Sequence, residues 1–123
     1  MNVVLSTTSG KPIYQQLFDQ ISAQIVKGEL PRDYCLPPIR TVAKELRISV
    51  IPVKRAWEDL ERAGFIYAMV GKGCFVAPLQ AAELDGKRDS LAVDQLKRDM
   101  DFYRGLGLSL DELVALIRKH YDK

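Results

Sequence analysis

A chain of 123 residues fits one domain, or one domain with a small appendage. Its composition, 47% hydrophobic and 28% charged, is that of an ordinary globular protein, and no apolar run approaches the ~20 residues that a membrane span needs. Residues 1–78 hold ten basic and seven acidic residues (+3) and residues 79–123 hold eight and nine (−1), so nucleic-acid binding would depend on where cations lie and not on total charge.

The N-terminal part predicts a strand, a loop and a helix. A short strand is expected from Asn2 to Leu5, followed by a Ser/Thr-rich loop. A helix is then expected from about Ile13 to Lys27, because apolar residues recur there at steps of four, and Gly28 ends it. Residues 28–38 contain three prolines and are expected to form a loop.

Two short amphipathic helices follow, separated by residues 47–50. The first has apolar residues at Ile39, Val42, Ala43 and Leu46, and the second repeats that spacing at Val53, Ala56, Trp57 and Leu60. Ser49 is placed to cap the second helix, Pro52 is tolerated in its first turn, and Gly64 can end it. Such closely spaced helices are typical of a helix-turn-helix.

The segment after these helices predicts a β-hairpin. Residues 65–69 and 74–76 are β-branched and aromatic runs, and Val70-Gly71-Lys72-Gly73 between them reads as a turn. Helix, turn, helix and hairpin in this order predict an α+β, mainly α, winged helix-turn-helix of three helices plus a hairpin wing. A helix-turn-helix places its second helix in the major groove of DNA.

The C-terminal part predicts two more helices after a polar junction at residues 79–90. Ser109-Leu110-Asp111-Glu112 has the pattern of a capping box that opens the last helix. About 45 residues rarely fold alone, so the apolar stripes of these helices must pack on something. The stripes are expected to form a dimer interface and consist of Val93, Leu96, Met100 and Tyr103 on one helix and Leu113, Leu116, Ile117 and Tyr121 on the other.

Six ordered motifs across residues 11–78 resemble the GntR family of bacterial transcription regulators. They are Pro12-Ile13-Tyr14-Gln15-Gln16-Leu17, Gly28-Glu29-Leu30, Leu36-Pro37-Pro38-Ile39-Arg40, Ile48-Ser49-Val50-Ile51-Pro52-Val53, Leu60-Glu61-Arg62-Ala63-Gly64-Phe65-Ile66 and Gly71-Lys72-Gly73-Cys74-Phe75-Val76. The resemblance implies a DNA-binding domain at residues 1–78. The tail, residues 79–123, resembles the two-helix dimerisation extension of the YtrA-like subfamily.

The resemblance also implies a function. We expect a cytoplasmic, homodimeric repressor of a nearby operon, with a transporter operon as one candidate. Its two recognition helices would meet a pseudo-palindromic double-stranded DNA operator. The candidate DNA-contacting residues are Arg40, Thr41, Ser49, Val50, Ile51, Lys54, Arg55, Gly71, Lys72 and Gly73. Arg40 matches the family's phosphate-contacting arginine, Lys54 matches a basic groove-facing position, and Lys72 lies at the wing tip.

Three residues depart from the family pattern. Pro38 and Pro52 replace the usual Ser and Thr, and Val50 stands where a polar residue or Arg is usual. Two accounts of this apolar helix tip compete: Val50 and Ile51 contact thymine methyl groups, or the site is degenerate and binds DNA weakly. An alternative function is a protein-interaction module in which the tip docks a protein.

Other residue types argue against catalysis. Cys35 and Cys74 lie far apart in sequence and have no Cys-x-x-Cys spacing, so they read as free thiols in a reducing cytoplasm. No Ser/His/Asp set, phosphate-binding loop or paired carboxylates are evident, and His120 reads as a helix C-terminal charge. We therefore expect no enzyme, cofactor, metal site or membrane association. The tail is too small to enclose an effector pocket.

Overall fold

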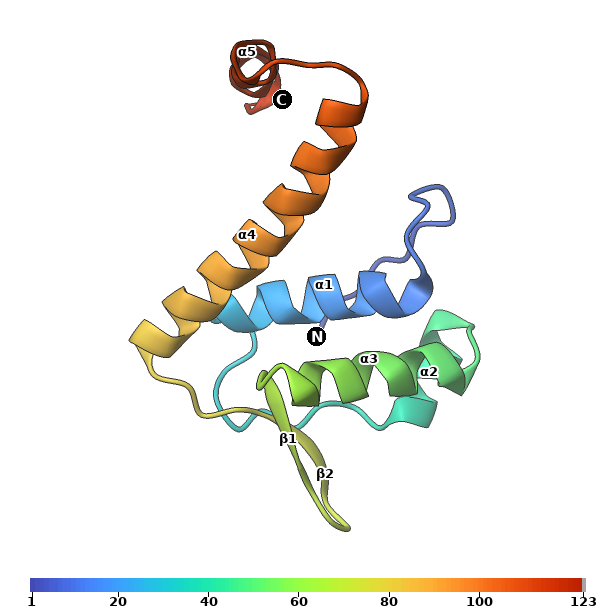
Figure 1. The fold of residues 1–123 in the computed structure, drawn as a ribbon. Coiled ribbons are helices and arrows are strands. Elements are labelled where there is room, and N and C mark those ends of the chain that lie inside the picture. Colours follow the sequence, from blue (N-terminus) through green and yellow to red (C-terminus); the bar gives the residue numbers. More distant parts are fainter. Residues whose placement is uncertain (123) are drawn as a thin grey trace. The chain divides into compact units, whose positions relative to one another are not determined.

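The computed structural model describes residues 1–122, which form two compact units, residues 1–85 and residues from 86 onward. The chain order is α1 (Ile13–Val26), α2 (Ile39–Leu46), α3 (Val50–Arg62), β1 (Ile66–Met69), β2 (Gly73–Val76), α4 (Ala81–Gly105) and α5 (Leu110–His120) (Figure 1). These elements confirm the predicted fold class, mainly α with a hairpin wing.

The core of the first unit lies mainly between α1 and α3. Leu17, Ile21 and Ile25 of α1 are buried, as is the stripe of α3. Side chains three and four residues apart share one helix face, so each helix presents one apolar stripe to the other. The predicted α3 stripe, Val53, Ala56, Trp57 and Leu60, is confirmed as core, with each side chain at most 4% exposed.

The wing is an antiparallel pair in which Ile66 lies opposite Val76 and Met69 opposite Gly73. A third extended segment, within the loop predicted at residues 28–38, pairs with β2. The backbone N–H of Leu36 donates to the carbonyl of Cys74 at 2.9 Å, and that of Val76 donates to the carbonyl of Tyr34 at 2.9 Å. This pairing ties the stem of the wing to the segment that leads into α2.

Two side chains also brace the wing stem. The hydroxyl of Tyr67 donates to Asp33 at 2.7 Å, and the Tyr67 ring stacks on Phe75. The hydrogen bond to the Asp33 carboxylate raises the pKa of Tyr67, because ionisation would lose the donated proton.

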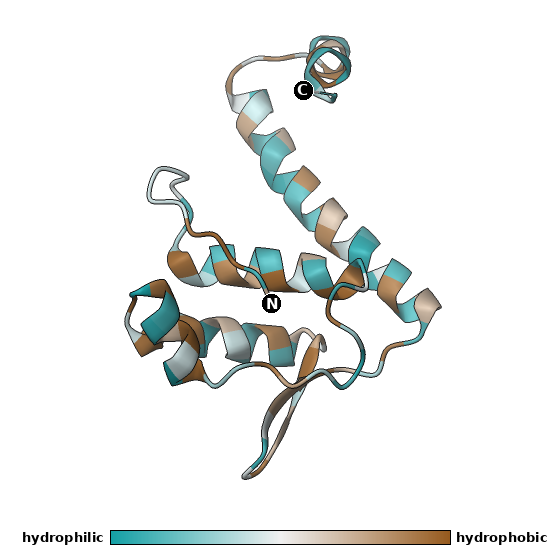
Figure 2. Cartoon of the chain, turned by 180° about the vertical axis from the view of Figure 1, so that it is seen from behind, coloured by the Kyte–Doolittle hydropathy of each residue, from teal (hydrophilic) through white to brown (hydrophobic). Residues whose placement is uncertain are grey.

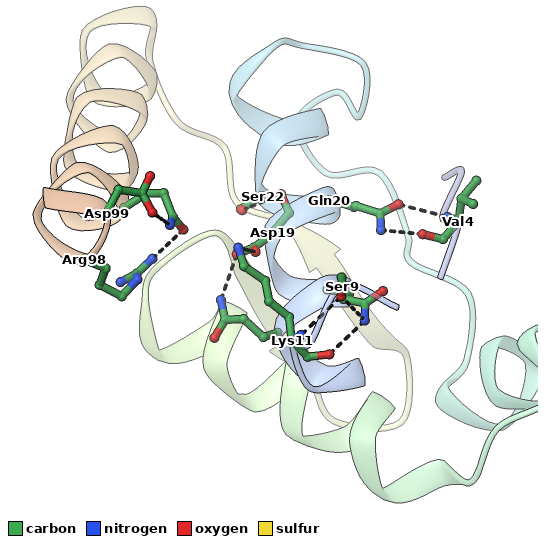
Figure 3. A network of polar contacts seen from close by, with 11 residues as sticks. Val4, Ser9, Lys11, Asp19, Gln20, Ser22, Arg98 and Asp99 are labelled. Atoms are coloured by element: carbon green, nitrogen blue, oxygen red, sulfur yellow. Dashed lines mark hydrogen bonds and ion pairs between the residues drawn. The ribbon is translucent and has the colours of Figure 1, made fainter. Parts of the chain in front are cut away.

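The N-terminal segment is extended but is not the strand expected at Asn2–Leu5. Its partners are glutamine side chains of α1. The amide of Gln20 accepts from the backbone N–H of Val4 at 2.9 Å and donates to the carbonyl of Val4 at 2.7 Å (Figure 3). The amides of Gln16 and Gln24 form the same pair of bonds with Ser6 and Asn2.

The spacing of the two backbones explains this pairing. Two residues of extended chain rise about 6.6–6.8 Å. Four residues of helix rise about 6.0 Å. Every second residue of the N-terminal segment therefore meets every fourth residue of α1. The alternation of half-buried and exposed side chains along residues 1–6 produces the strand-like pattern of the sequence.

The prediction of a polar junction at residues 79–90 is wrong, because α4 already begins at Ala81. The backbone N–H of Gln80 donates to the carboxylate of Glu83 at 3.0 Å, which stabilises the helix start. The run Ala81-Ala82-Glu83-Leu84 consists of strong helix formers, so the helix continues through Gly86 at a cost of about 1 kcal/mol.

The capping box that opens α5 is confirmed. The backbone N–H of Glu112 donates to the Ser109 hydroxyl at 3.2 Å, and the backbone N–H of Ser109 donates to the Glu112 carboxylate at 3.1 Å. These bonds lower the pKa of Glu112. Within residues 1–122, no helix has both the length and the apolar composition that crossing a membrane requires.

Candidate nucleic-acid interface

The turn between α2 and α3 sets the start of the candidate recognition helix. Arg47 ends α2 in the left-handed conformation, with φ 58° and ψ 46°. The backbone N–H of Ile48 then donates to the carbonyl of Ala43 at 2.9 Å. Ser49 occupies the N-cap position of α3, but its side chain makes no capping hydrogen bond, so the cap predicted for it is wrong. Its exposed hydroxyl is left available for another partner.

Beside its buried stripe, α3 has an exposed face. Ile51 is 74% exposed and Val50 is 44% exposed, at the N-terminal end of the helix. Pro52 lies in the first turn, as predicted. The face is shallowly hollowed over about 400 Å³, lined by Ile51, Lys54, Arg55, Glu58, Asp59 and Arg62. It is basic toward its beginning and carries acidic side chains further along.

The basic residues of this region fall into two groups. Arg55 and Arg62 are engaged: Asp59 lies 3.9 Å from the Arg55 guanidinium and 2.7 Å from that of Arg62. The Arg55 guanidinium also stacks on the Tyr14 ring of α1, 3.7 Å from its centroid. Arg55, predicted as a DNA contact, is thus held against α1 within the chain.

Arg40, Lys54 and Lys72 form the second group. They are exposed, and none pairs with an acidic side chain among residues 1–122. They come from α2, α3 and the wing. A basic side chain without an ion pair can bind a phosphate without first breaking an interaction within the protein. Thr41 is exposed beside Arg40 on α2, and Pro38 at the N-cap position of α2 provides no side-chain cap.

The wing tip presents its lysine on a tight turn. Gly71 has φ 76° and Gly73 has φ 111°. Residues other than glycine rarely adopt these backbone conformations, so the turn requires glycine at both positions. The backbone N–H of Lys72 donates to the carbonyl of Met69 at 2.9 Å and closes the turn. Val70, the first residue of the predicted turn, is fully exposed.

The predicted dimerisation residues are exposed or half-buried in the single chain. No side chain of α4 or α5 is buried, and several apolar ones are more than half exposed, such as Leu96 of α4 and Tyr121 at the C-cap of α5. Apolar residues recur at intervals along α4 (Figure 2). Within the described residues of the second unit, α5 does not pack along α4. No group of three metal-ligating side chains occurs in residues 1–122.

The cysteines lie on neighbouring extended segments, Cys35 exposed and Cys74 half-buried, and both are free thiols. Burial raises the pKa of Cys74, and the nearby Glu61 and Cys35 raise it further. A raised thiol pKa lowers the thiolate fraction at neutral pH, so Cys74 is poorly suited to nucleophilic chemistry.

Comparison with known proteins agrees with this geometry. Residues 13–76 match the family described as "Bacterial regulatory proteins, gntR family". The chain is 31% identical to the HTH-type transcriptional regulator YhcF of Bacillus subtilis, over 89% of this chain and 90% of YhcF.

Two solved structures extend the comparison. YtrA from Sulfolobus acidocaldarius, a GntR-family transcription factor, has a TM-score of 0.62 and 30% identity, covering 86% of this chain and 98% of that one. The DNA-binding domain of AraR, solved in complex with operator ORR3, has a TM-score of 0.53 and 27% identity, covering 63% of this chain and 93% of that one. The winged helix-turn-helix, its exposed cations and these matches together show that the chain belongs to the GntR family of bacterial regulatory proteins, with a YtrA-like extension.

Proposed function

We propose that this protein is a homodimeric transcription repressor that binds a pseudo-palindromic DNA operator through α2, α3 and the wing. The observation that carries the proposal is the set of exposed, unpaired cations Arg40, Lys54 and Lys72, one on each of these elements. Phosphate contacts of this kind fix the register of a protein on the duplex. Support also comes from AraR, whose DNA-binding domain was solved with an operator.

The two functions fall on consecutive parts of the chain. We assign DNA binding to residues 1–78 and dimerisation to residues 79–123. Uncovered apolar side chains on α4 and α5 support the second assignment, because a second copy of the chain could bury them. A two-fold dimer would present two copies of α3 to half-sites about 10 base pairs apart or a multiple of that spacing.

Selection from a random-sequence duplex library tests the proposal. The intact chain should enrich an inverted repeat whose half-sites keep one constant spacing. The triple variant Arg40→Ala/Lys54→Ala/Lys72→Ala should enrich nothing, while its circular dichroism spectrum stays that of the wild type because all three side chains are exposed. Enrichment of no sequence by the wild type would contradict the repressor function.

A further inference from the structure

The N-terminal turn of α3 carries an apolar surface that the fold does not use. Ile51 is 74% exposed and Val50 is 44% exposed, whereas Val53 and Ala56 on the inner face are fully buried. An exposed isoleucine is ordinary by itself. Its position is informative, because the N-terminal residues of a recognition helix are the ones that contact base edges.

Few polar groups at this end of α3 can read bases by hydrogen bonding. Pro52 has neither a side-chain donor nor a backbone N–H. Arg55 is held by Tyr14 at 3.7 Å and by Asp59 at 3.9 Å. Ser49 and Lys54 remain, so apolar contact is the main source of specificity that the tip offers.

The distribution of charged side chains along α3 indicates which part of the helix contacts DNA. Lys54 lies one turn after Ile51 on the same face, where side chains three apart are neighbours. Glu58 lies one turn further along, where its carboxylate would repel phosphates, and the charge of Arg62 beyond it is neutralised by Asp59 at 2.7 Å. The N-terminal half of the helix is therefore the part complementary to DNA, and Ile51 is its most exposed apolar side chain.

Thymine alone among the four bases presents a methyl group in the major groove. We propose that Ile51, with Val50 beside it, reads thymine methyl groups, and that each operator half-site carries thymine beneath the first turn of α3. This inference rests on the DNA-binding function proposed above. Removing one methyl from such a contact costs about fourfold in affinity, the scale of one buried methylene.

Deoxyuracil substitution tests this contact, because it removes only the thymine methyl. In the duplex that the wild type enriches, each thymine is replaced in turn and the dissociation constant is measured. At one or two positions in each half-site, the wild type should lose about fourfold for each methyl removed. For at least one of these positions, Ile51→Ala should have the same dissociation constant for the thymine duplex and the uracil duplex. The variant lacks the side chain that contacts the methyl group.

Val70→Ala is the matched control, since it shortens an exposed apolar side chain on the wing and leaves α3 unchanged. It should keep the full uracil penalty. A selected operator whose affinity no uracil substitution changes would overturn the inference and leave the repressor function standing. An Ile51→Ala variant that keeps every uracil penalty, or that keeps all DNA affinity and loses a bound protein partner, would also overturn it. Enrichment of no duplex by the wild type would overturn both proposals.

Discussion

Arg47 carries local backbone strain at the turn of the helix-turn-helix. Its φ of 58° lies in the left-handed region, which costs a residue with a side chain about 1 kcal/mol and costs glycine almost nothing. The Arg47 side chain is exposed, and the residue follows the last turn of α2. The strain therefore has a direct test.

Arg47→Gly should stabilise the protein by about 0.5–1 kcal/mol, because glycine adopts this conformation without strain. Lys44→Gly, at an exposed helical position of α2, should destabilise it by a similar amount. Arg47→Ala separates the loss of the side chain from the relief of strain and should bring no gain. Urea midpoints at an unchanged m-value measure all three. Equal destabilisation by both glycine variants would show that Arg47 is not strained.

The sequence predicted the placement of some site residues better than others. All three unpaired cations follow from motif position. The helical period also puts Arg40 and Lys54 away from the buried stripes, and the glycine-flanked turn puts Lys72 at the wing tip. Arg55 sits beside Lys54 in the same pattern, yet Tyr14 and Asp59 hold it. The Tyr14 contact depends on how α1 packs against α3, which a local pattern does not contain.

At the scale of elements, the N-terminal segment shows how a side-chain ladder can replace a strand partner. Gln16, Gln20 and Gln24 read from sequence as ordinary polar helix positions. Only the packed structure shows that their amides bind the backbone of residues 2–6. The helices and wing of the first unit were predictable because each shows a characteristic spacing of apolar residues and a residue that ends the element. The start of α4 was not, because polar helix formers around Gly86 resemble a linker.

Gln20→Ala should release the middle of this ladder. Both bonds to Val4 are lost, and we expect the backbone order parameter of Val4 to fall from about 0.85 toward 0.6. The free energy of unfolding should fall by about 1 kcal/mol, the scale of an ordinary hydrogen bond. Gln15→Ala is the control, because the Gln15 amide donates to Asp19 at 2.8 Å and is not part of the ladder. A Val4 amide with unchanged mobility in Gln20→Ala would contradict the ladder.

At the scale of the whole molecule, the second unit has no apolar core of its own within the described residues. We predict that Leu116→Glu converts the dimer to a monomer, because a charge would be buried at the proposed interface. Ala115→Glu adds the same charge to the opposite face of α5 and should remain dimeric. Sedimentation velocity at micromolar concentration measures both, with circular dichroism to confirm helicity. A wild-type chain that sediments as a monomer would contradict the assignment.

We propose above that this winged helix-turn-helix binds duplex DNA through cations that the fold leaves unpaired. The most direct measurement is the salt dependence of binding by the intact chain to the selected operator. Arg40→Ala should reduce the log–log slope by about 2, since each of two subunits loses roughly one phosphate contact. Arg62→Ala should leave the slope unchanged, because Asp59 already neutralises that charge at 2.7 Å. An Arg40→Ala slope equal to that of the wild type would contradict the claim.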